Sequence, residues 1–202
     1  MGWSVALLLG GLTACGGRPA ENAPPAPAPG EHGPSSHAAS AEARIEHSVD
    51  ELLSRMTLDE KIDYLGGDRE FFIRAIPRLG IPAVKMSDGP QGCRNWGPST
   101  AYPSPVGWAA SFDAELGREV GEAMGRDCRA RGVGVLLAPG VNIHRSPKNG
   151  RNFEYFGEDP WLAGEMAVQF TRGVQSQGVV ATVKHYVANN RETERDTVSS
   201  DV

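Results

Sequence analysis

The sequence has no run of 18 or more apolar residues, which excludes a membrane-spanning helix on length alone. It also has no excess of basic residues, since 20 Lys and Arg stand against 25 Asp and Glu, giving a net charge of −5. A nucleic-acid partner, which requires a basic surface, is therefore not expected. The 202 residues are enough for one domain with a sizeable core and an additional segment.

Cysteine is scarce, and Cys15, Cys93 and Cys128 are the only three. The odd number excludes a fully paired disulfide framework, and their distances along the chain exclude two zinc-binding CxxC pairs. Cys93 and Cys128 are compatible with a disulfide outside the cytoplasm, and equally with two buried free thiols.

Several motifs that carry a known chemistry are also missing. The sequence contains no GxGxxG after a strand, no Walker A motif, no HExxH and no GxSxG. His144 and His185 are not at the spacing of metal ligands. We therefore expect neither a metal ion nor a cofactor.

Residues 1–15 resemble a bacterial lipoprotein signal peptide. An apolar run over residues 3–14 has the length of a signal-peptide core, and Leu12-Thr13-Ala14-Cys15 resembles the lipobox, whose cysteine is lipidated. The resemblance implies a lipid on Cys15, membrane attachment through that lipid, and a place in the cell envelope, periplasmic or at the outer membrane. The alternative is a cysteine that follows an apolar stretch by chance.

The next segment, residues 16–43, contains no Val, Ile, Leu, Met or aromatic residue and is rich in Ala, Pro and Gly. Because such a segment cannot bury apolar surface, we expect a disordered linker. From residue 44 to 202 the composition is that of a globular domain. Two capping boxes, Ser48 with Glu51 and Thr57 with Glu60, predict two short helices, and Gly66 ends the second.

Strands and helices then alternate along the chain. Short apolar runs predict strands at 83–87, 133–138 and 179–183. Periodic apolar residues predict helices at 113–131 and from 159 to about 178. This pattern indicates a parallel α/β fold, either a doubly wound sheet or a (β/α)8 barrel, in which ligands bind at the carboxyl ends of the strands.

Charged residues follow all three predicted strands. Asp88 and Arg94 come after the first, Arg151 is in the long loop after the second, and Lys184 and His185 directly follow the third. A carboxylate accepts two hydrogen bonds from a diol, and Arg and Lys donate to the same oxygens. We therefore expect a polar ligand rich in hydroxyl groups at this edge of the sheet.

Each of these residues also has a purely structural interpretation. Asp88 suits a turn, and Arg151 is close in sequence to acidic residues with which it can pair. Lys184 at a strand end is able to extend into solvent, and His185 to be a hydrogen-bonded core histidine. The recurrence at three strand ends favours the ligand site.

Four segments resemble the N-terminal domain of glycoside hydrolase family three: SRMTLDEK (54–61), RLGIPAVKMSDGPQGCR (78–94), APGVNIHRSPKNGRNFEYFGEDP (138–160) and VKHYVANNRETER (183–195). The resemblance is to bacterial β-glucosidases and covers residues 44–202. It implies a (β/α)8, or TIM-type, barrel, of which these residues form the N-terminal part. It also implies hydrolysis of terminal β-D-glycosidic bonds with retention of configuration, through a covalent intermediate.

The resemblance further implies substrate contacts for six residues. The family's motifs supply a carboxylate that binds glycone hydroxyls, an arginine in the same loop, three basic residues around the sugar, and an arginine near the nucleophile. The matching residues are, in that order, Asp88, Arg94, Arg151, Lys184, His185 and Arg195. The continuation of the Lys-His pair is YVANN rather than PGHG, which argues against the N-acetylglucosaminidase branch, while a glucoside and a xyloside both fit.

The resemblance places the two catalytic carboxylates of the family beyond Val202, the nucleophile on a later barrel strand and the acid/base in a following domain. The 159 residues from 44 to 202 compare with about 250 for a complete barrel. We therefore interpret the chain as a fragment without a catalytic residue, inactive and aggregation-prone in isolation. The alternatives are a non-catalytic carbohydrate-binding surface lipoprotein or a truncated remnant.

Overall fold

The computed structural model describes residues 36–199, so the expected signal peptide, Cys15 and residues 16–35 of the expected linker lie outside it. Residues 36–43, also expected in the linker, instead belong to helix α1 (Ser36–Arg55). They contain four alanines and no proline, and alanine is the best helix former. In the described part of the chain no helix is both long and apolar enough to cross a membrane.

Helix α1 also overturns the first predicted capping box. It runs through Ser48, which therefore lies inside the helix rather than at its start. The second capping box is confirmed, because the Thr57 side chain accepts from the Glu60 N–H and the Glu60 side chain accepts from the Thr57 N–H. Helix α2 (Leu58–Leu65) follows, and Gly66 caps its end as predicted.

Residues 48–199 belong to one compact unit, whose sheet has the strand order β1-β2-β3-β4-β5. Strands β1 (Gly67–Asp68) and β2 (Phe72–Ile73) form an antiparallel hairpin, and β2 pairs antiparallel with β3 (Val84–Asp88). The sequence analysis did not predict this hairpin, because two-residue strands are too short to show an alternating pattern.

The three predicted parallel strands are confirmed; the first is shifted by one residue, and the other two are shorter than expected. Strand β3 pairs with β4 (Val135–Leu137), and β4 pairs with β5 (Val180–Ala181), with Asp88 opposite Leu137 at the end of the first pair. Short 3-10 turns at Pro77–Leu79 and Asn152–Glu154 and helix α3 (Pro105–Ala109) lie in the connections.

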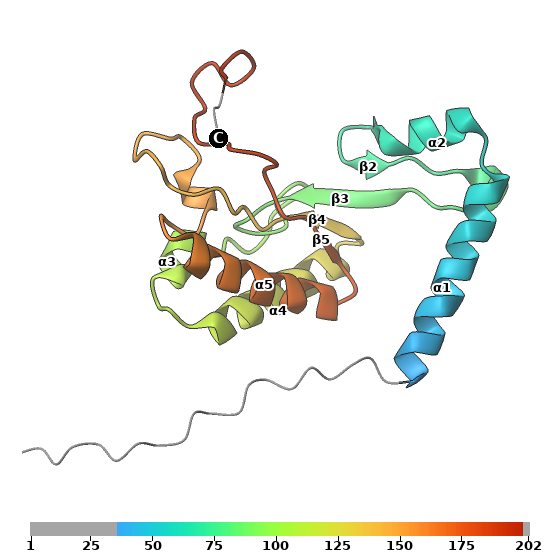
Figure 1. The fold of residues 1–202 in the computed structure, drawn as a ribbon, viewed down its shortest axis with the longest axis horizontal. Coiled ribbons are helices and arrows are strands. Elements are labelled where there is room, and N and C mark those ends of the chain that lie inside the picture. Colours follow the sequence, from blue (N-terminus) through green and yellow to red (C-terminus); the bar gives the residue numbers. More distant parts are fainter. Residues whose placement is uncertain (1–35, 200–202) are drawn as a thin grey trace, which may run out of the picture. The chain divides into compact units, whose positions relative to one another are not determined.

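Helices α4 (Ala114–Ala130) and α5 (Pro160–Ser176) connect the parallel strands, and aspartates cap both, at Asp113 and Asp159. The two helices pack side by side against the same face of the sheet (Figure 1). Successive neighbouring strands with their helices on one face are the arrangement of a (β/α) barrel, whereas a doubly wound sheet carries helices on both faces. The unit is therefore the first arc of such a barrel.

Glycines let α4 and α5 approach closely. A Cβ atom on Gly121 of α4 would lie 2.3 Å from the Phe170 carbonyl oxygen, and one on Gly173 of α5 would lie 2.2 Å from the Arg118 carbonyl oxygen. Below the sheet, Trp108 meets Phe156 edge-on and stacks on Phe170. The fully buried members of this core include Met124, Cys128, Leu136, Met166 and Val174.

The sheet edge formed by β5 is apolar and exposed to solvent. Among residues 36–199, β5 pairs with β4 alone, and Val180 and Val183 are each more than half exposed. A cavity of about 650 Å³ beside α5 is lined largely by apolar side chains, among them Val141, Ile143 and Val183. This edge has the character expected of a barrel face that packs against further structure.

Candidate functional site

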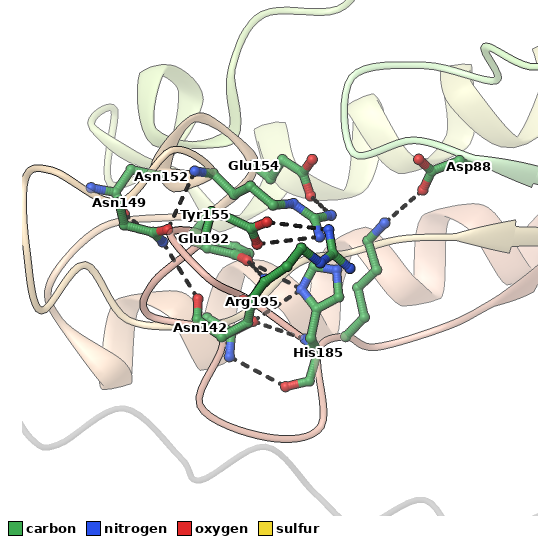
Figure 2. Close-up of polar contacts among 12 residues, drawn as sticks. Asp88, Asn142, Asn149, Asn152, Glu154, Tyr155, His185, Glu192 and Arg195 are labelled. Atoms are coloured by element: carbon green, nitrogen blue, oxygen red, sulfur yellow. Dashed lines mark hydrogen bonds and ion pairs between the residues drawn. The ribbon is translucent and has the colours of Figure 1, made fainter. Parts of the chain in front are cut away.

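Asp88, at the carboxyl end of β3, lies between two cations. Its Oδ1 accepts a hydrogen bond of 2.7 Å from Lys184 Nζ, and its Oδ2 accepts one from Arg94 (Figure 2 shows the first). A parallel bridge between Gly140 and Lys184 continues the line of β4 and β5, which brings Lys184 to the same edge as Asp88. Burial acts to raise the pKa of Asp88, but Lys184 and Arg94 outweigh it, and the pKa lies below its usual value.

The loop after β3 turns back so that Arg94 meets Asp88. Gly89 and Gly92 have φ of 142° and 135°, and a Cβ atom on Gly89 would lie 1.7 Å from the Gly92 carbonyl oxygen, so only glycine fits there. Asn95 Oδ1 accepts from the Asp88 N–H at 2.5 Å, which closes the loop at its base. The loop is thus shaped by its backbone, and the Asp88–Arg94 pair follows from that shape.

Arg151 lies at the start of the 3-10 turn after β4 and is held by two glutamates. Its Nη2 donates to Glu154 Oε2 at 2.6 Å, and its Nη1 lies 3.7 Å from Glu192 Oε1. The Glu154 side chain is 3% exposed and that of Arg151 is 18% exposed, so the ion pair is largely excluded from solvent. Glu192 also accepts from Arg195 at 3.2 Å, and Arg195 itself is 61% exposed.

His185 is fixed by the side chains of two neighbours, Asn142 and Tyr155 (Figure 2). Asn142 Oδ1 accepts from the His185 backbone N–H at 2.9 Å and lies 3.1 Å from Nδ1, while Asn142 Nδ2 donates to the His185 carbonyl oxygen. The Tyr155 hydroxyl lies 3.1 Å from Nδ1 and accepts from Asn189 at 2.9 Å. The Lys184–His185 peptide bond is cis.

These contacts define the state of the imidazole. Burial, with the charges of Arg151 and Lys184, lowers the pKa of His185 to about 4, so the ring is neutral near pH 7. Asn142 Oδ1 can only accept, so the ring proton is on Nδ1. Nε2 is then an acceptor, and no hydrogen bond to it is found within residues 36–199. Burial also raises the pKa of Tyr155 to about 12, which keeps its hydroxyl protonated.

A cavity of about 360 Å³ adjoins this cluster. Lys184, His185, Asn142 and Arg145 line it together with the segment that follows His185. Asp88 and Arg151 do not line it. The cavity therefore shares only the Lys-His corner with the charged cluster and lies beside it.

The structure brings together the residues that the sequence analysis selected. Asp88, Arg94 and Lys184 are in direct contact, and Arg151 is linked to Arg195 through Glu192. Of the two acidic residues that the sequence offers as structural partners of Arg151, Glu154 and Asp159, Glu154 is the one that pairs with it. Within residues 36–199, no group of three His, Cys, Asp or Glu side chains is arranged so that it could hold a metal ion.

Four further residues of the cluster were not selected from the sequence. They position the selected ones: Asn142, Glu154, Tyr155 and Glu192. Glu154 had a usable signal, since an acid three residues after Arg151 lies on the same side of a helical turn. Glu192 has the same spacing from Arg195, with which it pairs. Asn142 and Tyr155 contact His185 across the fold, and no local pattern marks them.

Comparison with known proteins agrees with this geometry. Residues 70–199 match the glycosyl hydrolase family 3 N terminal domain. The beta-glucosidase of Rhizobium radiobacter is 48% identical over 160 residues, which are 76% of this chain and 20% of that protein. Thermostable beta-glucosidase B of Acetivibrio thermocellus is 45% identical over 164 residues, which are 75% of this chain and 22% of that protein.

Solved structures similar in fold are also beta-glucosidases. Beta-glucosidase 3B from Thermotoga neapolitana in complex with alpha-D-glucose aligns with a TM-score of 0.66 and 44% identity, over 72% of this chain and 24% of that one. Beta-glucosidase from Kluyveromyces marxianus in complex with glucose aligns with a TM-score of 0.69 and 42% identity, over 71% and 18%. The chain thus spans about a fifth of the length of the relatives it matches. With the family match covering more than half of its residues, this chain belongs to glycosyl hydrolase family 3.

Proposed function

We propose that this chain forms part of the glycone-binding site of a retaining β-glucosidase, which hydrolyses terminal β-D-glycosidic bonds. The observation that carries the proposal is the Asp88 carboxylate held between Lys184 and Arg94 at the strand ends. Support comes from the relatives, which are named beta-glucosidases and include structures in complex with glucose. The chain spans only a fifth of their length, so the hydrolytic activity is proposed for the protein as a whole.

The charges suit a neutral sugar with adjacent hydroxyl groups. Asp88 stays ionised because of its two cations, and an ionised carboxylate accepts two hydrogen bonds from a pair of hydroxyls. Lys184 Nζ and the Arg151 guanidinium donate to the hydroxyl oxygens. Neutral His185 accepts a hydrogen bond from a hydroxyl group at Nε2, a role that an imidazolium could not fill.

The same geometry argues against a catalytic role for the carboxylates of this cluster. Retaining hydrolysis requires two carboxyl groups about 5–5.5 Å apart, one as nucleophile and one as acid/base. Asp88, Glu154 and Glu192 are each paired with Lys or Arg. We propose that they bind and position, and we assign neither catalytic role to a residue of this chain.

A chimera tests the proposal. Residues 44–202 would replace the matching segment of the Rhizobium radiobacter beta-glucosidase, and release of an aryl alcohol from an aryl β-glucoside would be measured. We expect hydrolysis, and we expect Asp88→Asn to lower kcat/KM by at least about 100-fold, because it removes charge-assisted hydrogen bonds. Asp50→Asn, on the exposed surface of α1, is the matched control and should leave kcat/KM unchanged. A folded chimera that is inactive, or an Asp88→Asn variant as active as its parent, would refute the proposal.

We also propose that Cys15 is lipidated and attaches the chain to the membrane in the cell envelope. The support is the lipobox-like Leu12-Thr13-Ala14-Cys15 after an apolar run. Bacteria expressing the whole chain would be fed labelled palmitate. Label should appear in the chain and in its Cys93→Ala variant and be lost from Cys15→Ala. Equal labelling of the Cys15→Ala variant, or no label in any form, would contradict the anchor.

A further inference from the structure

Two thiols lie buried beneath the loop that carries Arg94. Cys93 precedes Arg94 in this loop, and Cys128 is in the last turn of α4. Neither side chain is exposed to solvent, and both belong to the same hydrophobic core. The Cys128 side chain lies within hydrogen-bonding reach of Cys93, and both residues are free thiols here.

Other contacts hold the two backbone segments together around this pair. Tyr102 bridges them, because its backbone N–H donates to the Gln91 carbonyl at 3.0 Å and its hydroxyl donates to Asp127 Oδ2 at 2.9 Å. Arg131, just after α4, donates to the Trp96 carbonyl at 2.9 Å. The loop and the end of α4 are therefore fixed side by side on both sides of the sulfur atoms.

We propose that Cys93 and Cys128 form a disulfide when the chain folds in the presence of a low-molecular-weight disulfide such as oxidised glutathione. The Cys93 thiolate attacks a glutathione sulfur and releases one glutathione thiolate. The Cys128 thiolate then attacks the mixed disulfide at Cys93 and releases the second. Two electrons pass from the cysteines to the glutathione disulfide, and the two cysteine protons end on the two released glutathiones.

The chemistry of the pair fits these roles. The hydrogen bond from Cys128 lowers the pKa of Cys93, and the same hydrogen bond, with burial, raises the pKa of Cys128. The thiolate is the nucleophile in disulfide exchange, so Cys93 attacks first once the two segments have come together and while the sulfur atoms are still accessible. Because neither thiol is accessible in the folded chain, the exchange occurs during folding, and the finished bond is shielded from reductants.

The cross-link has a structural consequence that does not depend on the proposed function. It ties the residue next to Arg94 to a helix, and it closes a loop that runs from residue 93 to residue 128. The loop carrying Arg94 is then fixed at two places, by the disulfide and by the Asp88–Asn95 hydrogen bond at its base.

A redox titration tests the proposal. The whole chain with Cys15→Ser would be equilibrated with mixtures of reduced and oxidised glutathione, in buffer and in 6 M guanidinium chloride. Trypsin digestion without reduction would then measure linkage of peptide 86–94 to peptide 127–129. We expect the disulfide to form in buffer at a glutathione mixture about 100-fold more reducing than in guanidinium chloride, because the folded chain holds the two cysteine-bearing segments side by side. Equal redox midpoints in buffer and in guanidinium chloride would overturn the proposal. So would a chain that, in buffer, carries free thiols or glutathione adducts instead of the disulfide at every glutathione mixture.

A thermal melt provides a second measurement. We expect the Cys15→Ser chain refolded with a reductant to have a Tm about 10 °C below that of the same chain refolded with oxidised glutathione, and the Cys15→Ser/Cys128→Ser chain to have the same Tm in both cases. A reductant that shifts neither melt, or both equally, would show that no stabilising bond joins the two cysteines.

Discussion

Replacing Gly173 of α5 with alanine should destabilise the α4–α5 pair. The new Cβ atom would lie 2.2 Å from the Arg118 carbonyl oxygen and 2.8 Å from the Glu122 backbone nitrogen, so the helices must separate by about 1 Å. Overpacking of this kind costs about 1–3 kcal/mol. The better helix propensity of alanine offsets about 1 kcal/mol of this cost. Because the obstacle is backbone and cannot move aside, we expect a net loss of about 1–2 kcal/mol in the free energy of unfolding.

Gly164→Ala, in the same helix, is the matched control. Nothing lies within 4 Å of its added Cβ atom, so only the propensity gain remains, and we expect a rise of about 0.5–1 kcal/mol. Urea unfolding followed by far-ultraviolet circular dichroism would measure both variants against the parent chain. If Gly173→Ala proved as stable as Gly164→Ala, the close approach of α4 and α5 would not be a feature of the folded protein.

Three further predictions concern the charged cluster and the open edge. Glu154→Gln should lower the free energy of unfolding by about 1–2 kcal/mol, because it leaves the nearly buried Arg151 guanidinium with only the more distant carboxylate of Glu192. Glu115→Gln on the surface should have no measurable effect in the same urea titration. The free energy of unfolding should fall as pH drops from about 6.5 to 4, because His185 binds a proton in that range in the unfolded chain but not in the folded chain. About 2 kcal/mol of this loss, after allowance for solvent screening, should be absent from the His185→Asn variant. Val183→Lys should reduce the aggregation of the isolated chain, measured by light scattering, without lowering its Tm, because it places a charge on an exposed apolar edge. Unchanged aggregation would show that this edge does not drive the association of the chain.

Local signals predicted the helices whose ends depend on one or two residues. Thr57 and Asp159 cap their helices as their sequence context indicates, because an N-cap is a contact between residues two or three positions apart. Ser48 carries the same signal but lies inside α1, since the residues before it are themselves good helix formers. A capping pattern therefore predicts a helix start only when the preceding chain has no reason to be helical.

The site divides in the same way between local and distant information. Asp88 and Lys184 were predictable because the carboxyl ends of adjacent parallel strands meet at one edge of a sheet. Tyr155 and Asn142 were not, because they contact His185 across 30 and 43 positions of the chain. The strand–helix pattern alone left two parallel folds open, the family resemblance favoured the barrel, and the packing of α4 and α5 on one face of the sheet agrees with it.

The separation of Asp88 and Lys184 along the chain also sets when the site can exist. Their side chains meet across 96 positions, and the contact requires β4, α4, α5 and β5 to be in place between them. Closing so long a segment is entropically costly, and such contacts form after local ones. During synthesis from the N-terminus, Asp88 therefore emerges with Arg94 as its sole strong partner and acquires the second only once β5 docks. Formation of the Lys184–Asp88 pair is thus expected late in the assembly of the unit, after its helices.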